Sequence, residues 1–353
     1  MATATKVDEI QVDSLVVMKI VKHIESERQS GGSDFAHGYL TGLVADDEHR
    51  LEITNCFPTA KPHGLVDDSD KDAQAEEDAK QMEIMYEMLK RYRQMNIDYE
   101  LVGFYESHPF GACFTKQLVE SMHDYQSSVV DGIVLIYDPV KTFQGQLSLR
   151  AFRLSQKAME LCYTDLSPDS VKQAGLTYAN MFEELELKIK NSHLVNVMLC
   201  EMSRQESKQN EPQFLELSGS GLNLERCLRQ LMGQVDILNR SVNDYNKYMQ
   251  QKEKQEALLR HMLEKRKLEN DQRRARGDLP LPVDVEEMRR SLRWPQLQDR
   301  DGMLASFLAA AQVKAHAQHC LKVSGKNLGK LFITEAVVED KPHKERSASS
   351  VTT

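Results

Sequence analysis

Gly103-Phe-Tyr-Glu-Ser-His-Pro-Phe-Gly-Ala-Cys-Phe-Thr115 is the stretch of this sequence that decides the fold. The residues from Tyr99 to Tyr105 predict a strand, and the side chains that could carry chemistry follow at its end. Glu106 offers a carboxylate and His108 an imidazole, which are both zinc ligands in proteins. The alternative is that His108 is a polar residue held by hydrogen bonds of the loop that it begins.

The stretch resembles the zinc motif of the MPN (JAMM) isopeptidase family. In that family a Gly-x-Tyr-His-Ser-His-Pro segment ends a strand, and a Ser and an Asp follow about one helical turn apart. Gly103, Tyr105, Ser107, His108 and Pro109 match this frame. The resemblance implies an α/β fold, namely an MPN (JAMM-like) domain with a central β-sheet flanked by helices.

The metal chemistry of the family is missing at most of the matching positions. Two His and the Asp hold zinc in the family, but here the first His is Glu106 and the Asp is Leu118, while Thr115 stands for the Ser one residue early. The general-base Glu lies three residues before a Gly-x-x-x-Gly pattern. Gly38-Tyr-Leu-Thr-Gly42 resembles that pattern, so the base position is Phe35.

A catalytic zinc needs about three protein ligands, an open water position and a nearby base. The degenerate positions Phe35, Glu106, His108, Thr115 and Leu118 supply one ligand of the family and no base. The resemblance therefore implies no catalytic residue, no metal and no cofactor. A replacement zinc set of Glu106, His108, His123 and Asp124 stays open, although its spacing matches no known zinc motif.

Composition and charge fit an ordinary intracellular protein of 353 residues, which is long enough for a sizeable core. The formal net charge of −9 argues against a general nucleic-acid-binding surface. There is no run of 18 apolar residues, and Met1 to Asp8 lacks the order of a signal peptide, so we expect no membrane segment. Six scattered cysteines without a Cys-x-x-Cys pair indicate reduced thiols.

Residues 8–208 predict one α/β domain, because strand and helix patterns alternate along them. After a short strand at Ile10 and a helix that Ser14 caps, we expect strands over 37–45, 49–57, 99–105, 132–138 and 147–154, and a further strand around Leu185 to Ile189. Helices are expected over 73–95 and 115–126, and from Asn191 or Ser192 to about Met202. The acidic segment from Lys61 to Asp78 predicts a solvated loop rather than a calcium site.

The second half of the chain predicts a helical extension. Residues 209–221 are polar and indicate a linker, and 222–276 predict one long helix with a heptad seam. The seam consists of Leu224, Leu228, Leu231, Val235, Leu238, Val242, Tyr245 and Met249. Such a seam needs a partner, which is either the helix from Leu304 to Leu321 or helices of other proteins in a complex.

A basic run follows the seam on the same helix. Its residues are Arg260, Lys265, Arg266, Lys267, Arg273, Arg274 and Arg276. The run is either a solvated helix face or a contact with RNA or an acidic protein, and the absence of aromatic residues argues against base stacking. Residues 277–303 predict a Pro-containing linker with Trp294, 304–340 predict C-terminal helices with a last short helix around 328–338, and 341–353 predict a disordered tail.

Five further segments resemble one family over nearly the full length, that of the h-type subunits of eukaryotic translation initiation factor 3. They are Arg50–Pro58, Val134–Pro139, Met181–Glu184, Ile189–His193 and Asn327–Phe332. The resemblance implies a cytoplasmic, non-catalytic scaffold protein whose MPN domain pairs with that of the f-type member and whose C-terminal helices join a bundle. The family's complex binds the small (40S) ribosomal subunit and promotes recruitment of mRNA and initiator methionyl-tRNA. Two alternatives stay open, an inactive MPN subunit of the proteasome lid or signalosome, and a zinc isopeptidase.

Overall fold

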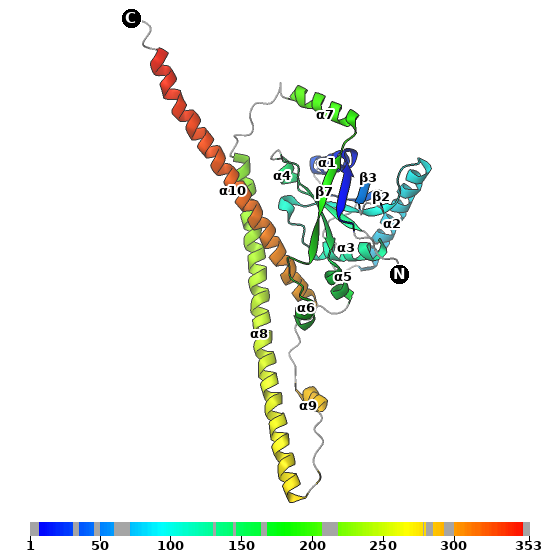
Figure 1. Ribbon diagram of the computed structural model, residues 1–353, viewed down its shortest axis with the longest axis vertical. Coiled ribbons are helices and arrows are strands. Elements are labelled where there is room, and N and C mark those ends of the chain that lie inside the picture. The colour runs from blue at the N-terminus through cyan, green and yellow to red at the C-terminus, as the bar shows by residue number, and fades with distance from the viewer. Residues whose placement is uncertain are drawn as a thin grey trace.

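The strands of this protein form one sheet that closes on itself. The computed structural model describes residues 7–30, 35–45, 50–59, 71–129, 132–143, 146–163, 168–206, 218–277, 279, 285–292 and 300–348 (Figure 1). The strands are β1 (Glu9–Asp13), β2 (His37–Ala45), β3 (Arg50–Thr59), β4 (Leu101–Ser107), β5 (Ile133–Tyr137), β6 (Leu149–Leu154) and β7 (Phe182–Lys190). Their order is β1-β3-β2-β4-β5-β6-β7, and β7 pairs with β1. The predicted central sheet is therefore a closed barrel.

The predicted pairing of the second and third strands is confirmed, and the motif strand lies beside them. β2 and β3 form an antiparallel hairpin, and β4 pairs antiparallel with β2. β4 and β5 are parallel, which requires a crossover, and α3 (Lys116–Ser128) supplies it. β5 is buried along its whole length, as its apolar sequence predicts.

Helices pack on the barrel over two hydrophobic clusters. α1 (Ser14–Gln29) buries Val16, Ile20 and Ile24 in one cluster. In the other cluster α3 buries Leu118, Val119 and Met122 against Phe104. The remaining helices of this part are α2 (Lys71–Gln94), α4 (Pro139–Phe143), α5 (Gln156–Tyr163), α6 (Pro168–Ala174) and α7 (His193–Glu206).

The apolar stripe of α2 was predicted to be core, and this is only partly right. Met85 and Tyr92 are buried, but Met82 and Tyr86 are exposed. The N-terminal half of α2 extends past the sheet (Figure 1), whereas Met85 and Tyr92 belong to the hydrophobic cluster that contains Phe104. Amphipathic spacing shows which face of a helix is apolar, but not how far along the helix a partner reaches.

The C-terminal extension is a helical hairpin beside the barrel. α8 (Ser218–Arg276) and α10 (Arg300–Ala348) run antiparallel and cross, and α9 (Val285–Ser291) lies near the far end of α8 (Figure 1). None of the helices among the described residues is both long and apolar enough to cross a membrane.

Three predicted boundaries of the extension are wrong. α8 begins at Ser218, inside the predicted linker 209–221, and α9 lies inside the predicted linker 277–303. α10 is one helix from Arg300 to Ala348, so it has no separate last helix and it covers most of the predicted disordered tail. α10 continues through Gly325 and Gly329, although glycine has a low helix propensity. Residues 60–70, 207–217, 293–299 with Trp294, and 349–353 lie outside the described residues.

α10 also belongs to the core of the barrel part. Leu304 and Leu308 are buried in the same cluster as Leu118. Ala309 and Ala311 are buried as well, because small side chains let a helix approach its neighbours closely. The first turns of α10 therefore complete the hydrophobic core that α3 begins.

Candidate functional site

The glycines of the motif are required by strand packing. A Cβ atom on Gly103 would overlap the carbonyl oxygen of Ile133 on the adjacent β5. A Cβ on Gly38 would overlap the ring of Tyr105, on the adjacent β4. These positions need glycine for close backbone approach, whether or not the site carries out chemistry.

Ser107 of the motif has a structural role. The backbone N–H of Ala36 donates to Ser107 Oγ at 2.7 Å, and the N–H of Ser107 donates to the Ala36 carbonyl at 3.0 Å. The N–H of His108 donates to the Tyr137 carbonyl at 2.9 Å. These bonds hold the end of β4 between the segment before β2 and the end of β5.

Glu106 lies between two histidines in the buried end of β4. Its Oε2 is 2.9 Å from Nε2 of His108, and its Oε1 is 3.9 Å from Nε2 of His37. All three residues are buried. At 2.9 Å the distance between the Glu106 carboxylate and the His108 imidazole is that of a hydrogen bond.

Phe35 occupies the position of the family's general base. Its ring lies edge-on to the His108 ring, with 5.5 Å between the centroids. A phenyl ring cannot accept a proton from a water molecule, so this position offers no base catalysis. The contact instead covers one face of His108 with apolar surface.

Thr115 and Leu118 begin α3. Thr115 is the N-cap, and its Oγ1 accepts a hydrogen bond from the Leu118 N–H at 3.2 Å. The Leu118 side chain is only 2% exposed and packs in the hydrophobic cluster. The position of the family's metal-binding Asp is therefore part of the core.

The replacement set is not brought together. Nδ1 of His123 lies 3.4 Å from Oδ1 of its neighbour Asp124, on α3. Among the side chains that the structure describes, there is no group of three or more His, Cys, Asp or Glu placed to hold a metal ion. Glu106, His108, His123 and Asp124 thus do not form one site.

The loop of the motif that follows β4 contacts α10, and the sequence did not predict this contact. Phe110 has a φ of 64°, and its ring is buried 5.0 Å from the ring of His319 and 6.1 Å from that of His316. The Phe110 N–H donates to Oδ1 of the buried Asp138 at 3.2 Å. A left-handed conformation at a bulky residue costs about 1–3 kcal/mol, so surrounding contacts must hold it in place. The available signal was the pair of histidines three residues apart on the Ala-rich helix face.

A second contact joins α10 to the same region, and burial affects the charge of its histidines. Nε2 of Gln312 donates to the Phe114 carbonyl at 2.7 Å. Burial lowers the pKa of His319 to about 4, with Lys141 adding to the effect, and burial also lowers the pKa of His316. The contact therefore requires neutral imidazoles.

Acidification is expected to weaken the α10 contact between about pH 6.5 and pH 4. His319 takes up its proton near pH 6.5 in the unfolded chain and near 4 when folded, so its contribution is complete above 6.5 and is lost as the pH falls. The loss amounts to about 3 kcal/mol at most. We expect His319→Gln to flatten the dependence of Tm on pH in this window. His193→Gln, at an exposed position, is the control, and equal slopes for wild type and His319→Gln would contradict the expectation.

The eight residues of the predicted seam divide between two faces of α8. One face contains four half-buried residues, Leu224, Leu231, Leu238 and Tyr245. On the same side, Cys227 contacts His316 of α10, and Tyr248 lines the groove beside α10. Leu228, Val242 and Met249 are 43%, 49% and 37% exposed. With Met232 and the half-buried Val235 they form a second apolar row, which we call the outer stripe.

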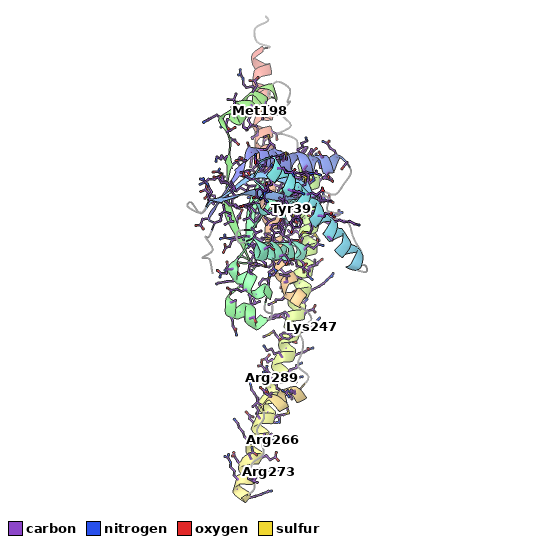
Figure 2. The ribbon with its side chains drawn as sticks, turned by 90° about the vertical axis from the view of Figure 1, so that its right-hand side faces the viewer. Tyr39, Met198, Lys247, Arg266, Arg273 and Arg289 are labelled. Carbon is purple, nitrogen blue, oxygen red and sulfur yellow. The ribbon has the colours of Figure 1, made fainter. Side chains whose placement is uncertain are left out.

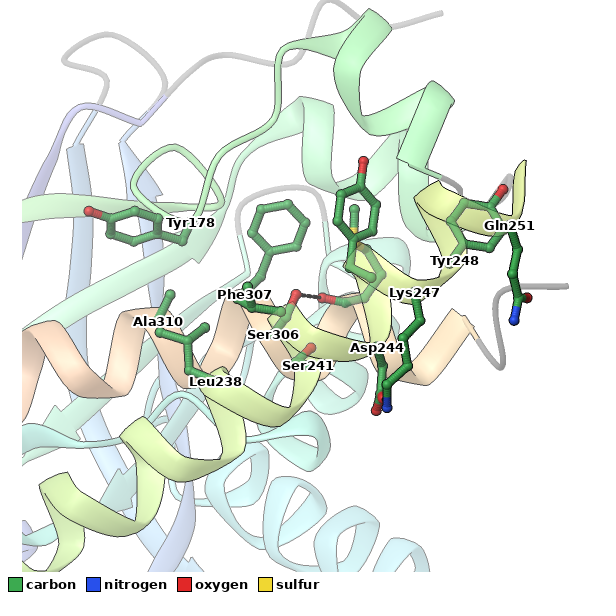
Figure 3. A pocket seen from close by; sticks show the side chains of 13 residues that line it. Tyr178, Leu238, Ser241, Asp244, Lys247, Tyr248, Gln251, Ser306, Phe307 and Ala310 are labelled. Atoms are coloured by element: carbon green, nitrogen blue, oxygen red, sulfur yellow. Dashed lines mark hydrogen bonds and ion pairs between the residues drawn. The ribbon is translucent and has the colours of Figure 1, made fainter. Parts of the chain in front are cut away.

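A groove of about 650 Å³ lies where α8 and α10 diverge (Figure 3). Its lining combines aromatic and aliphatic side chains, including Tyr178, Leu238, Val242, Tyr245, Tyr248, Met303 and Phe307. Val242 belongs to both the groove and the outer stripe. An apolar surface therefore continues from the groove along α8.

The predicted basic run lies on the part of α8 that projects beyond the barrel, where Figure 2 labels Arg266 and Arg273. Arg260 pairs with Glu256 at 3.7 Å, and Arg273 pairs with Glu269 at 3.5 Å, each one turn away on the same helix. Lys265, Lys267, Arg274 and Arg276 are exposed, and Arg266 is half-buried. Contact of this run with RNA or an acidic protein stays a prediction.

α7 exposes apolar side chains to solvent. Leu194 is 82% and Val197 67% exposed, and Met198 lies on the same helix, above the barrel in Figure 2. A contiguous apolar patch of this kind marks a contact surface in many proteins.

Two family profiles match the chain. The C-terminal region of eIF3h matches residues 142–343, and the JAB1/Mov34/MPN/PAD-1 ubiquitin protease family matches residues 5–129.

Individual proteins are similar over nearly the whole length. The H subunit of eukaryotic translation initiation factor 3 from Brugia malayi is 50% identical, covering 94% of this chain and 92% of its own. The H subunit from Caenorhabditis elegans is 47% identical, covering 99% and 97%. The H-B subunit from Danio rerio is 39% identical, covering 94% of each chain.

Proposed function

The chain belongs to the H subunit family of eukaryotic translation initiation factor 3, and from this premise we propose that it is a non-catalytic scaffold. Family membership makes it a component of a translation initiation factor with an MPN domain. The proposal adds that its contribution is binding surface. It assembles with the other components of the factor in the cytoplasm and takes part through them in binding the small ribosomal subunit and recruiting mRNA and initiator tRNA.

One observation carries the proposal, namely the outer stripe of α8. Leu228, Met232 and Val242 are substantially exposed although α10 already covers the neighbouring face of the helix. An apolar row at heptad spacing, left uncovered by the described part of its own chain, is what a helix of a shared bundle presents. We infer that helices of other subunits pack on this stripe, and that the groove, which Val242 also lines, receives one of them.

The proposal divides the chain into a domain and a helical extension that contact different partners. We assign residues 8–208 to the MPN domain and the helices after it to the bundle. The MPN domain is proposed to pair with that of the F subunit, and the exposed apolar side chains of α7 are consistent with a protein contact there.

The motif region supports the absence of catalysis through the chemistry of its residues. A phenyl ring, a leucine and a carboxylate in a hydrogen bond to imidazole stand where a zinc hydrolase would need a base and ligands. We expect the purified chain to hold less than about a tenth of an equivalent of zinc and to leave a ubiquitin dimer uncleaved.

The measurement is elemental analysis of the purified chain together with a gel assay of dimer hydrolysis. The control is His108→Ala, which should behave as the wild type in both assays. Stoichiometric zinc, with turnover that His108→Ala abolishes, would refute the absence of catalysis.

Affinity capture of the tagged chain tests the proposal that the protein is a scaffold. Initiation-factor subunits should be recovered with the chain, and their absence would contradict the proposal.

A further inference from the structure

Two thiols from different helices meet inside the α8–α10 hairpin. Sγ of Cys227 on α8 lies 3.4 Å from Sγ of Cys320 on α10. Cys227 is fully buried, whereas Cys320 is partly exposed. Ninety-three positions separate them in the sequence, so only the packing of the hairpin brings them together.

We propose that Cys227 and Cys320 are a redox site, which hydrogen peroxide converts into a disulfide that locks α8 to α10. A disulfide needs the sulfur atoms about 2.05 Å apart, so they must approach by about 1.4 Å from their observed separation. Rotation about χ1 displaces a sulfur atom by more than this distance, so side-chain rotation is large enough to bring the two sulfur atoms together. In reducing compartments such disulfides are typically transient and redox-sensing rather than structural.

The exposure of the two thiols sets the order of the reaction. Cys320 first loses its proton, and its thiolate attacks one oxygen of the peroxide. The O–O bond breaks, and the hydroxide that leaves takes up that proton, which gives water and a sulfenic acid at Cys320. Cys227 then loses its proton and attacks the Cys320 sulfur, the S–O bond breaks, and the released hydroxide takes up that proton as a second water. Two thiols and one peroxide thus give one disulfide and two waters, with two electrons passing from sulfur to oxygen.

His316 is placed to take the proton of Cys227. Its Nδ1 lies 3.5 Å from Sγ of Cys227. Burial lowers the pKa of His316, so the imidazole is neutral at physiological pH, and its unprotonated nitrogen can relay the Cys227 proton to the hydroxide that leaves Cys320. Burial raises the pKa of the Cys227 thiol, which keeps Cys227 protonated and leaves Cys320 to react first.

The disulfide would fix the relative position of α8 and α10, the two helices that form the surface of the hairpin. Cys320 lies one residue after His319, which packs on Phe110 of the motif loop. A covalent bond to Cys227 would therefore fix the N-terminal part of α8 against the same segment of α10 that contacts the barrel. Reduction by a thiol would release it.

The test uses the full chain, reduced, treated with hydrogen peroxide, alkylated and digested with trypsin. We expect linked peptides 227–229 and 315–322 with the loss of about 2 Da, and their separation by dithiothreitol. The yield should be about tenfold or more above that from the urea-unfolded chain, because only the folded hairpin holds the sulfurs in contact.

Two substitutions complete the test. Cys200→Ser changes an exposed thiol elsewhere and should leave the link unchanged, whereas Cys320→Ser should abolish it. Peptide mapping of the wild type needs no variant to fold, so a destabilised Cys320→Ser does not affect the main result. Oxidation of Cys200 without a Cys227–Cys320 link, or an equal yield from the unfolded chain, would overturn the proposal.

Discussion

Leu118→Asp is expected to unfold the barrel domain rather than restore a zinc site. The substitution supplies the carboxylate that zinc hydrolases of the MPN family have at this position. In this protein, however, the side chain is 2% exposed and packs with Val119, Met122 and the α10 residues Leu304 and Leu308. Removing the leucine loses about 2–5 kcal/mol, and burying an unpaired carboxylate adds several more. The sum is comparable to the whole stability of a typical domain.

The measurement is the midpoint of urea unfolding, followed by circular dichroism with and without added zinc. Leu118→Met is the matched control, because a volume-conserving apolar change should cost less than about 1.5 kcal/mol. A folded Leu118→Asp protein with near-wild-type stability that binds one zinc would show that this position can hold a metal-binding carboxylate without loss of the core. That outcome would contradict our account of the core.

The barrel part was predictable where local sequence decides the structure. The motif glycines, the apolar β5 and the N-cap Thr115 each constrain their own segment, and the predicted elements there match the observed ones within a few residues. The chemistry at Phe35, Glu106 and Leu118 could likewise be stated from residue type, because a phenyl ring or a leucine cannot ligate zinc wherever it lies.

Contacts between distant segments could not be predicted in the same way. Closure of the barrel depends on β7 reaching β1, more than 170 positions earlier, and no local pattern encodes that pairing. The contact of Phe110 with α10 depends on histidines and alanines that lower the apparent amphipathicity of the helix. Burial of a neutral imidazole is a tertiary property, so the sequence alone did not predict this contact.

The residues of the predicted heptad seam belong to two adjoining surfaces of α8. Spacing predicted one row of eight residues, and Leu231 and Leu238 are indeed half-buried on the α10 side. Leu228 and Val242 lie on the adjoining exposed flank. Residues spaced alternately four and three apart form two adjoining rows on a helix. One row can therefore pack in the hairpin while the other packs in a shared bundle. The two alternatives for the partner of this helix are therefore compatible.

Leu228→Glu with Val242→Glu is expected to release the chain from its complex while the hairpin stays folded. Both side chains are about half exposed, so charge there should change stability by less than about 1 kcal/mol in the free chain. In a bundle the same carboxylates would be buried against apolar residues, which costs several kcal/mol each and should reduce recovery of partner subunits by about a hundredfold or more. Affinity capture of the tagged chain with quantitative mass spectrometry measures the loss.

Ile237→Glu with Leu258→Glu is the matched control for that loss. Ile237 is 43% and Leu258 50% exposed on the same helix, so the number, type and exposure of the changed residues agree. Both lie roughly 120–180° around the helix from Leu228, away from the outer stripe. The control should keep its partners if the stripe is the docking surface. Equal recovery of subunits by the stripe variant and the control would place the docking surface elsewhere, for which the exposed apolar side chains of α7 are the next candidate.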